Sequence, residues 1–599
     1  MWTCIILLFY TFAILVQGDE DWKLVNTTQG PVRGRKDSDG GLYVFYNIPY
    51  ATAPTGTDRF KAPLPPPVWM SPFDAVNRDI RCPQGPNESN MREDCLVANL
   101  FVPDTTETNL PVLVNVHGGA FQYGHGLSRQ YKTLVQTKKI IAVSFNYRLG
   151  VHGFLCLGTE GAPGNAGIKD QVAFLRWIRK NIASFGGNPE DVTLIACSAG
   201  SGSVDVLTLS SATEGLFNKA IMESGISTGA TGVVIDPIQN AKNFAKELGF
   251  NDVDDLDKLE EFYTTASYQQ LTSDLYAIVD NEDVMIRFAP CVEKDVGQER
   301  VIMDTPMNVM KQGNYTKVPL LYGFTNMEGS MRLSYFDTWK IRMNEKFSDF
   351  LPAELRFDSE AIKEEVAQKV KQFYFGNDPV SEASMVSYLL YFTDVLFAYP
   401  MLRSLSTRVE ALGDTIYLFE YSFVDEQTPL FPHTDVRGAG HCFQSRAVAD
   451  QDLSGSTEEY KRMVEILREY TLNFIFTGSP TPSGSSLPQW PPANAQRSPY
   501  MSLGSVIELK ENILENRAAF WDAIYEEYYG GPVMPSATTT TTTTTTVAVA
   551  VTNPDLTTND PTTPVPATTP DPGSDGAVSL MISNVLFMAV LSLFYLSLQ

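Results

Sequence analysis

The chain has 599 residues, of which 43% are hydrophobic and 19% are charged, so it has enough apolar material to bury a large core. Its formal net charge is −25, which argues against a nucleic-acid partner because no basic surface is available to neutralise phosphates. The excess of acidic residues indicates a soluble surface whose negative charge repels other copies. The alternative interpretation is a negative electrostatic field that attracts cationic ligands.

The N-terminal segment, residues 1–18, is an apolar run that ends in Gly18 before the acidic Asp19. This length and ending are typical of a secretory signal peptide. Export implies an oxidising compartment, in which disulfides form. After removal of the signal six cysteines remain: Cys82, Cys95, Cys156, Cys197, Cys291 and Cys442. Three N-x-[ST] triplets are candidate N-glycosylation sites: Asn26, Asn87 and Asn314.

Residues 19–532 alternate between strand and helix patterns and are predicted to form one large domain. Three short apolar runs are expected to be strands: 113–116, 140–145 and 191–196. Between the last two, residues 169–187 carry apolar side chains at helical spacing and end in two glycines. Strand, helix, strand is a βαβ unit, and repeated units predict an α/β fold with a largely parallel sheet.

The third run leads into Ala196-Cys197-Ser198-Ala199-Gly200. A serine on a sharp turn from strand to helix is the nucleophile-elbow arrangement, in which the residues two positions either side must be small. Ala196 stands where G-x-S-x-G has its first glycine, but it is still small. On its own the motif is a weak signal, because chance matches are common in a chain with 42 glycines.

A second motif, His117-Gly118-Gly119-Ala120, follows the first predicted strand. An oxyanion loop has to lie upstream of the nucleophile in this way. The backbone N–H groups of Gly118, Gly119 and Ala199 are therefore the candidate oxyanion hole. A flexible turn is the alternative interpretation, and the spacing of the two motifs favours the functional one.

A nucleophile elbow of this kind belongs to a catalytic triad in which the serine comes first in the chain, an acid second and a histidine third. Of the five histidines, His433 and His441 lie late enough. His433 is in a polar loop, whereas His441 follows small residues at 438–440 that let an imidazole approach a site. Glu328 follows an apolar strand end and is the candidate acid. A lone histidine is more often structural and a loop glutamate more often a solvated charge, so both assignments need further support.

The composition changes abruptly near residue 533, and nine consecutive threonines follow at 538–546. Residues 533–573 are predicted to be a disordered Thr/Pro-rich stalk, either O-glycosylated or an unmodified tail. Residues 574–599 begin with small residues, continue as an apolar stretch and contain no Lys or Arg. This pattern favours a GPI-anchor signal over a C-terminal membrane helix, and it predicts a protein that is attached to the cell surface or secreted.

Between about residues 22 and 530, a series of short stretches in a fixed order along the chain resembles the cholinesterase/carboxylesterase family, the type-B carboxylesterases. The stretches that carry this resemblance are GPVRG (30–34), FYNIPYATAP (45–54), EDCLVANLFVP (93–103), VHGGAF (116–121), NYRLG (146–150), GNAGIKDQ (164–171), FGGNPEDVTL (185–194), ESG (223–225) and WPP (490–492).

The resemblance implies an α/β-hydrolase fold, in which helices flank a large, mostly parallel central sheet. It also implies that Ser198 is the nucleophile, Glu328 the acid and His441 the base in the hydrolysis of a small-molecule carboxylic ester. No metal and no organic cofactor are implied. The family's first disulfide would join Cys82 to Cys95.

Three departures from the family bear on the substrate. Cys197 and Gln444 stand where cholinesterases carry acidic residues, and the loop from Cys82 to Cys95 has no tryptophan. Cholinesterases hold a quaternary ammonium by a cation–π contact with a tryptophan of this loop. Neutral esters are therefore the expected substrates, rather than choline esters.

Two alternatives remain open at this level. Cys197 and Cys442 adjoin Ser198 and His441, and they are either buried free thiols that act as small hydrophobes or a disulfide that locks the two segments together. The protein itself is either an active esterase or a catalytically inactive adhesion or binding ectodomain. The surviving serine, glutamate and histidine favour the esterase, and no feature of a lipase groove or lid is recognisable.

Overall fold

The computed structural model describes residues 21–76, 78, 80–85, 88–229, 231–272 and 286–535. The predicted signal peptide, nearly all of the predicted stalk, the predicted anchor segment and Asn87 lie outside these residues. One described helical stretch, Glu382–Leu412, is long and apolar enough to cross a membrane. Because 83% of its apolar window is buried inside the protein, it is a core element of the domain.

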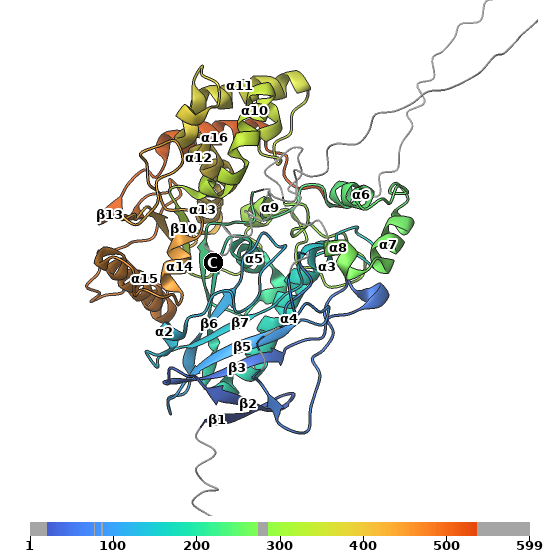
Figure 1. Ribbon diagram of the computed structural model, residues 1–599, viewed down its shortest axis with the longest axis vertical. Coiled ribbons are helices and arrows are strands. Elements are labelled where there is room, and N and C mark those ends of the chain that lie inside the picture. Colours follow the sequence, from blue (N-terminus) through green and yellow to red (C-terminus); the bar gives the residue numbers. More distant parts are fainter. Residues whose placement is uncertain are drawn as a thin grey trace, which may run out of the picture. The chain divides into compact units, whose positions relative to one another are not determined.

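One mixed sheet of 13 strands forms the centre of the domain (Figure 1). Its strands are β1 (Trp22–Thr27), β2 (Gly30–Lys36), β3 (Leu42–Pro49), β4 (Phe73–Asp74), β5 (Val97–Pro103), β6 (Leu110–Val116), β7 (Ile141–Phe145), β8 (Gly187–Cys197), β9 (Lys219–Glu223), β10 (Leu320–Thr325), β11 (Ile416–Tyr421), β12 (Tyr500–Leu503) and β13 (Ile507–Lys510).

The strand order is β1-β2-β3-β5-β7-β6-β8-β9-β10-β11-β12-β13, and β4 pairs with β2. From β7 to β12 every neighbouring pair is parallel, whereas the other pairs along this order, at both ends of the sheet, are antiparallel; β4 pairs with β2 in parallel. The three predicted strands are β6, β7 and β8, and the prediction of a largely parallel sheet is confirmed. The carboxyl ends of these parallel strands meet at one edge, where open α/β sheets bind their ligands.

Helices cover both faces of the sheet. They are α2 (Lys132–Val135), α3 (Gly150–Phe154), α4 (Ala166–Asn181), α5 (Ala199–Leu209), α6 (Pro237–Glu247), α7 (Leu256–Thr265), α8 (Tyr268–Thr272), α9 (Pro306–Gln312), α10 (Phe336–Glu345), α11 (Glu360–Phe375), α12 (Met385–Thr393), α13 (Tyr399–Leu412), α14 (Phe443–Val448), α15 (Glu458–Thr477) and α16 (Glu515–Tyr528). The helix predicted at 169–187 is α4, which ends at Asn181 and continues as a short 3-10 turn, Ile182–Phe185.

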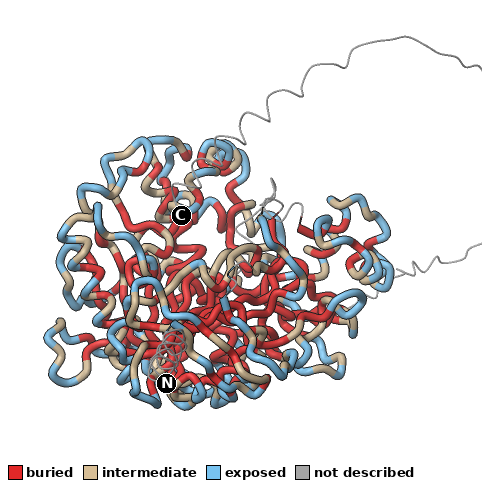
Figure 2. The backbone as a smooth tube through the Cα atoms, turned by 60° about the horizontal axis from the view of Figure 1, so that its bottom comes forward, coloured by how far each residue is buried: buried red, intermediate tan, exposed pale blue. Residues whose placement is uncertain are grey.

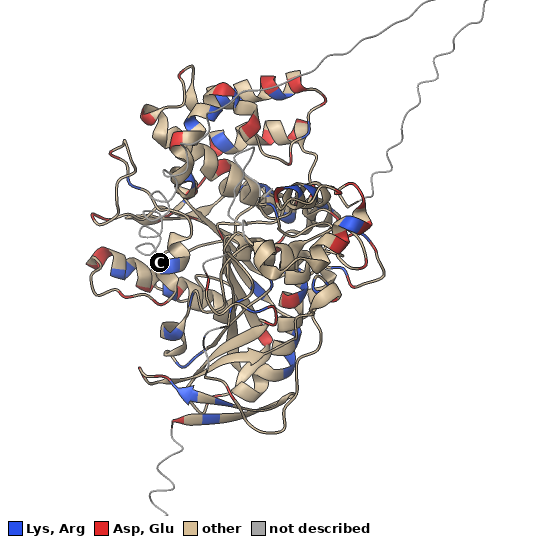
Figure 3. Ribbon diagram, turned by 45° about the vertical axis from the view of Figure 1, so that its right-hand side comes forward, with Lys and Arg blue, Asp and Glu red and all other residues tan. Residues whose placement is uncertain are grey.

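Alternation along the strands gives the sheet two apolar faces. In β6, Val112 and Val114 pack into the core beneath α4 and α5, whereas Leu113 packs with α15 on the other face. A third core lies among α10, α11, α12 and α16. Buried segments fill the interior of the domain and exposed loops surround it (Figure 2). Charged residues are concentrated on the helices and loops, and most of the sheet is drawn in the colour of uncharged residues (Figure 3).

Candidate active site

Ser198 lies between β8 and α5, at the carboxyl edge of the sheet. Its φ of 63° and ψ of −133° put a residue with a Cβ in a backbone region that costs about 1–3 kcal/mol. The turn is held by the Ser198 N–H, which donates to the carbonyl of Glu223 at 2.9 Å. A Cβ on Gly200 would collide with the carbonyl of Val116, and a Cβ on Gly225 with that of Ser198. The sharp turn therefore needs small residues around the serine, as predicted.

The loop after β6 lies against this turn. A Cβ on Gly118 would meet the carbonyl oxygen of Cys197 at 2.6 Å and Cβ of Ser198 at 3.1 Å, so only glycine allows this approach. Gly119 has a φ of +116°, which also favours glycine. Within the described residues, no acceptor is found for the backbone N–H groups of Gly118, Gly119 and Ala199. These donors are thus available to an oxygen placed beside the serine.

His117 lies at the start of this loop as a buried, neutral imidazole. Burial lowers its pKa to about 3, although its contact with the carbonyl of Gly118 opposes the shift. The ring stacks on Tyr147 with 4.3 Å between centroids, and the Tyr147 hydroxyl donates to the His117 carbonyl at 2.8 Å. A neutral imidazole in a stacked position holds the backbone that leads into the two glycines.

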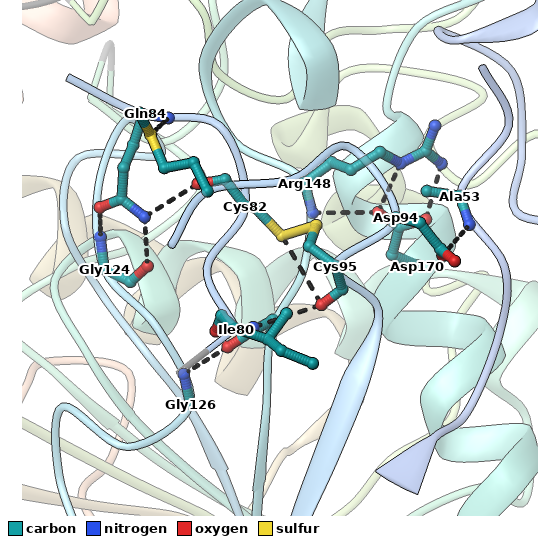
Figure 4. Close-up of a disulfide and its surroundings, with 12 residues drawn as sticks. Ala53, Ile80, Cys82, Gln84, Asp94, Cys95, Gly124, Gly126, Arg148 and Asp170 are labelled. Carbon is teal, nitrogen blue, oxygen red and sulfur yellow. Dashed lines mark hydrogen bonds and ion pairs between the residues drawn. A yellow bond between two sulfur atoms is a disulfide. The ribbon is translucent and has the colours of Figure 1, made fainter. Parts of the chain in front are cut away.

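The loop between Cys82 and Cys95 braces the other end of the glycine segment (Figure 4). The Gln84 side chain donates to the Gly124 carbonyl at 3.1 Å and accepts the Gly124 N–H at 3.0 Å. Gly124 in turn packs on the start of the loop, because a Cβ there would lie 2.6 Å from Nδ1 of His117. Gln84 is buried, and sequence reasoning missed it because nothing local marks the contact.

Glu328 and His441 are in direct contact. Oε2 of Glu328 lies 2.6 Å from Nδ1 of His441, and Oε1 accepts the Thr325 N–H at 2.8 Å. The carboxyl is fully buried just after β10, whereas His441 comes from the loop between β11 and α14 and lies on the Phe397 ring at 4.6 Å. Because a carboxylate can only accept, Nδ1 is the donor and Nε2 is left as the acceptor. Nε2 is buried and has no hydrogen-bond partner among the described residues.

The second late histidine, His433, lies in the same long loop but takes no part in this contact. No hydrogen bond joins Ser198 to His441 in the described part of the chain; a disulfide links the residues next to them. The structure thus brings together the glutamate and the histidine singled out by sequence, beside a serine on a strained turn.

Comparison with known proteins shows which family the chain belongs to. The sequence profile of the Carboxylesterase family matches residues 21–521. The chain belongs to the carboxylesterase family. It is 30% identical to Juvenile hormone esterase of Heliothis virescens over 516 residues, which are 80% of this chain and 90% of that protein. It is also 30% identical to Para-nitrobenzyl esterase of Bacillus subtilis over 505 residues, or 82% and 96% of the two chains.

Solved structures of carboxylesterases share the fold. The crystal structure of Juvenile hormone esterase from Manduca sexta, with OTFP covalently attached, matches with a TM-score of 0.75 and 27% identity over 84% of this chain and all of that one. PNB esterase matches with a TM-score of 0.67 and 29% identity over 83% and 99% of the two chains. The predicted α/β-hydrolase fold is confirmed, and the relatives support a serine carboxylesterase activity for this chain.

All six described cysteines of this carboxylesterase are paired. The predicted bond between Cys82 and Cys95 is present, and Cys156 pairs with Cys291. Cys197 pairs with Cys442, so the interpretation of these two as free buried thiols is wrong. The cause is tertiary: the last residue of β8 and the residue before α14 meet at the same edge of the sheet with Cα atoms 6.1 Å apart. No local pattern encodes that proximity.

Glu223, the last residue of β9, is a buried acid behind the site. Burial raises its pKa to about 7, and Glu328 adds to the shift, whereas the hydroxyl of Ser445 and the charge of Arg129 oppose it. Its Oε2 has no hydrogen-bond partner among the described residues. In the sequence the residue stands only as part of a family stretch. The signal that could have found it is an acid directly after the apolar run Ala220–Met222 at the end of a buried strand.

The remaining predicted sites are peripheral. Asn26 and Asn314 are exposed, and Asn87 lies outside the described residues. In the part of the chain that the structure describes, no group of three or more His, Cys, Asp or Glu side chains is suited to hold a metal ion.

Proposed function

We propose that this carboxylesterase works through an acyl-enzyme on Ser198, with His441 as general base and Glu328 as the acid that orients it. The Ser198 hydroxyl attacks the ester carbonyl while Nε2 of His441 takes its proton. His441 returns the proton to the leaving alcohol, and water then hydrolyses the acyl-serine with His441 again as base. The observation that carries the proposal is the 2.6 Å contact between Glu328 and His441, which leaves Nε2 as a buried, open acceptor.

The backbone N–H groups of Gly118, Gly119 and Ala199 stabilise the negative oxygen of the tetrahedral intermediate. Two observations support this role. Gly118 packs closely on the turn at Ser198, and the described residues provide no acceptor for these three N–H groups. Such preorganised donors are worth about 10²–10³ in rate for each hydrogen bond.

The preferred substrates are neutral esters. The loop from Cys82 to Cys95 carries no tryptophan, so it offers no indole ring for a cation–π contact with a quaternary ammonium. Cys197 and Gln444 contribute no charge near Ser198, and the carboxyl of Glu223 behind the site has its pKa raised to about 7 by burial. Comparison of kcat/KM on an uncharged aryl ester with that on an acyl thiocholine tests this preference, and a higher value on the thiocholine ester would contradict it.

Labelling with a fluorophosphonate tests the nucleophile. The wild-type protein is expected to label on one serine and to hydrolyse p-nitrophenyl acetate, and Ser198→Ala is expected to lose both. Ser211→Ala is the matched control, because Ser211 is an exposed serine in the 3-10 turn after α5. Label that persists in Ser198→Ala would overturn the assignment. Absence of label and of hydrolysis in the wild type would instead favour the inactive adhesion ectodomain.

We also propose that the protein is exported, glycosylated and held at the cell surface by a lipid anchor. The disulfides are consistent with an oxidising compartment, and Asn26 and Asn314 are exposed. Removal of N-glycans should increase the electrophoretic mobility of the wild type, and Asn26→Gln and Asn314→Gln should each reduce that change. Release from cells by a phosphatidylinositol-specific phospholipase supports the anchor, whereas retention favours a membrane helix.

A further inference from the structure

The Cys197–Cys442 disulfide joins the residue before Ser198 to the residue after His441. Both cysteines are buried, with 1% and 4% of their surfaces exposed, and 245 positions separate them. The bond therefore connects two segments that are far apart in the chain, at positions directly next to Ser198 and His441.

Hydrogen bonds attach the His441 segment to strands other than the one that carries Ser198. The Ala439 N–H donates to the Asn326 side chain at 3.0 Å, just after β10. Gln444 donates to the hydroxyl of Ser224 at 3.0 Å, just after β9. The Cys197–Cys442 disulfide attaches the segment to β8, the strand whose end holds the nucleophile.

The backbone at Cys442 has a conformation that few side chains adopt. Its φ of 63° and ψ of 19° lie in the left-handed region, which favours glycine and disfavours a residue with a Cβ. From this backbone conformation the Cys442 side chain forms the bond to Cys197, so the bond offsets part of the conformational cost.

We propose that this disulfide is a positioning element of the active site, which fixes the distance between the serine elbow and the imidazole of His441. The proposal rests on the roles proposed above for Ser198 and His441. Ser198 and His441 are each one residue from the bond. No hydrogen bond between Ser198 and His441 is present in the described residues to fix their distance. Loss of alignment between a nucleophile and its base costs rate even when substrate still binds.

The test is the full-length enzyme, expressed through the secretory pathway, with Cys197→Ala and Cys442→Gly together, where glycine relaxes the backbone at 442. We expect kcat on p-nitrophenyl acetate to fall about tenfold or more, with KM changed by less than about threefold. The rate constant of fluorophosphonate labelling should fall by the same factor as kcat, because it depends on the same serine and base.

The matched control is Cys156→Ala with Cys291→Ala, which removes another buried long-range disulfide. We expect a lower melting temperature but an unchanged kcat. If the first variant melts cooperatively and keeps kcat within twofold, or if both variants lose kcat equally, the disulfide is structural only and the proposal is wrong. A wild type that neither labels nor hydrolyses refutes the proposed function itself, which is a different outcome.

Stepwise reduction of the wild type covers the case in which the variant does not fold. A dithiol reductant converts the disulfide to two cysteine thiols and is itself oxidised to its cyclic disulfide. The thiols are alkylated after each step, and peptide mapping reports which bond has opened. Activity should be lost in step with opening of Cys197–Cys442. Full activity with both of these cysteines alkylated would overturn the proposal.

Discussion

Nδ1 of His441 lies 2.6 Å from Oε2 of Glu328, although 113 residues separate them in the chain. The carboxyl is fully buried, and its other oxygen is held by the backbone of Thr325. The contact with the carboxylate makes Nδ1 the donor, which sets the imidazole tautomer.

Replacement of Glu328 by glutamine keeps the size of the side chain but removes the negative charge opposite the imidazole. We expect kcat on a neutral aryl ester to fall by about a thousandfold or more, because the imidazolium formed during attack loses its partner. Glu426→Gln, an exposed change in the loop that leads to His441, is the control and should be neutral. A fall of less than tenfold in Glu328→Gln would argue that another acid orients the histidine.

Gly118→Ala tests the oxyanion loop. The added methyl group would meet the carbonyl of Cys197 at 2.6 Å, so the loop must move away from the serine. We expect kcat to fall by about a hundredfold or more while the fold survives. Gly455→Ala is the control, because a Cβ at that position meets nothing within 4 Å. Equal kinetics for the two variants would remove Gly118 from the site.

Gln84→Met keeps the volume of the side chain but removes both hydrogen bonds to Gly124. Since Gly124 packs against His117 and Gly118, we expect the donors of the glycine loop to lose their alignment. The predicted result is a kcat lowered about tenfold with little change in KM. A change confined to melting temperature would show that Gln84 acts on stability alone.

Glu223→Gln tests the buried acid through stability. The folded-state pKa is about 7, against an ordinary value of 4.5, so the folded protein binds the extra proton between these two values. The free energy of unfolding of the wild type should therefore fall, as pH rises from 4.5 to above 7, by about 3 kcal/mol from this group. Glutamine does not titrate, so the free energy of unfolding of the variant should rise relative to that of the wild type as pH increases across that range.

Urea unfolding of both proteins at pH 5 and pH 8 measures this difference directly. Every other titrating group is common to the two proteins, so the change in their difference isolates Glu223. A difference that is the same at both pH values would mean that Glu223 is charged in the folded protein throughout.

Sequence patterns predict those parts of the site that lie within one short stretch of the chain. The elbow at Ser198 and the glycines at 118–119 follow apolar strands, so their places at the sheet edge could be predicted. His441 could be chosen over His433 from its small neighbours and from the resemblance. The Cys197–Cys442 bond, the clamp of Gln84 on Gly124 and the burial of Glu223 could not be predicted, because each depends on segments that meet only after the sheet has formed.

The wide separation of Cys197 and Cys442 in the chain has a consequence for folding during synthesis, because Cys197 is made long before its partner. At about 5–20 residues per second, the 245 residues between the two cysteines take roughly 12–49 s to translate. During that interval Cys197 is present without its partner, while Cys82, Cys95 and Cys156 have already been made. A premature bond from Cys197 to one of these earlier cysteines would join the nucleophile's strand to the wrong segment. Yield of active enzyme should therefore depend on the disulfide-isomerase capacity of the cell that makes it.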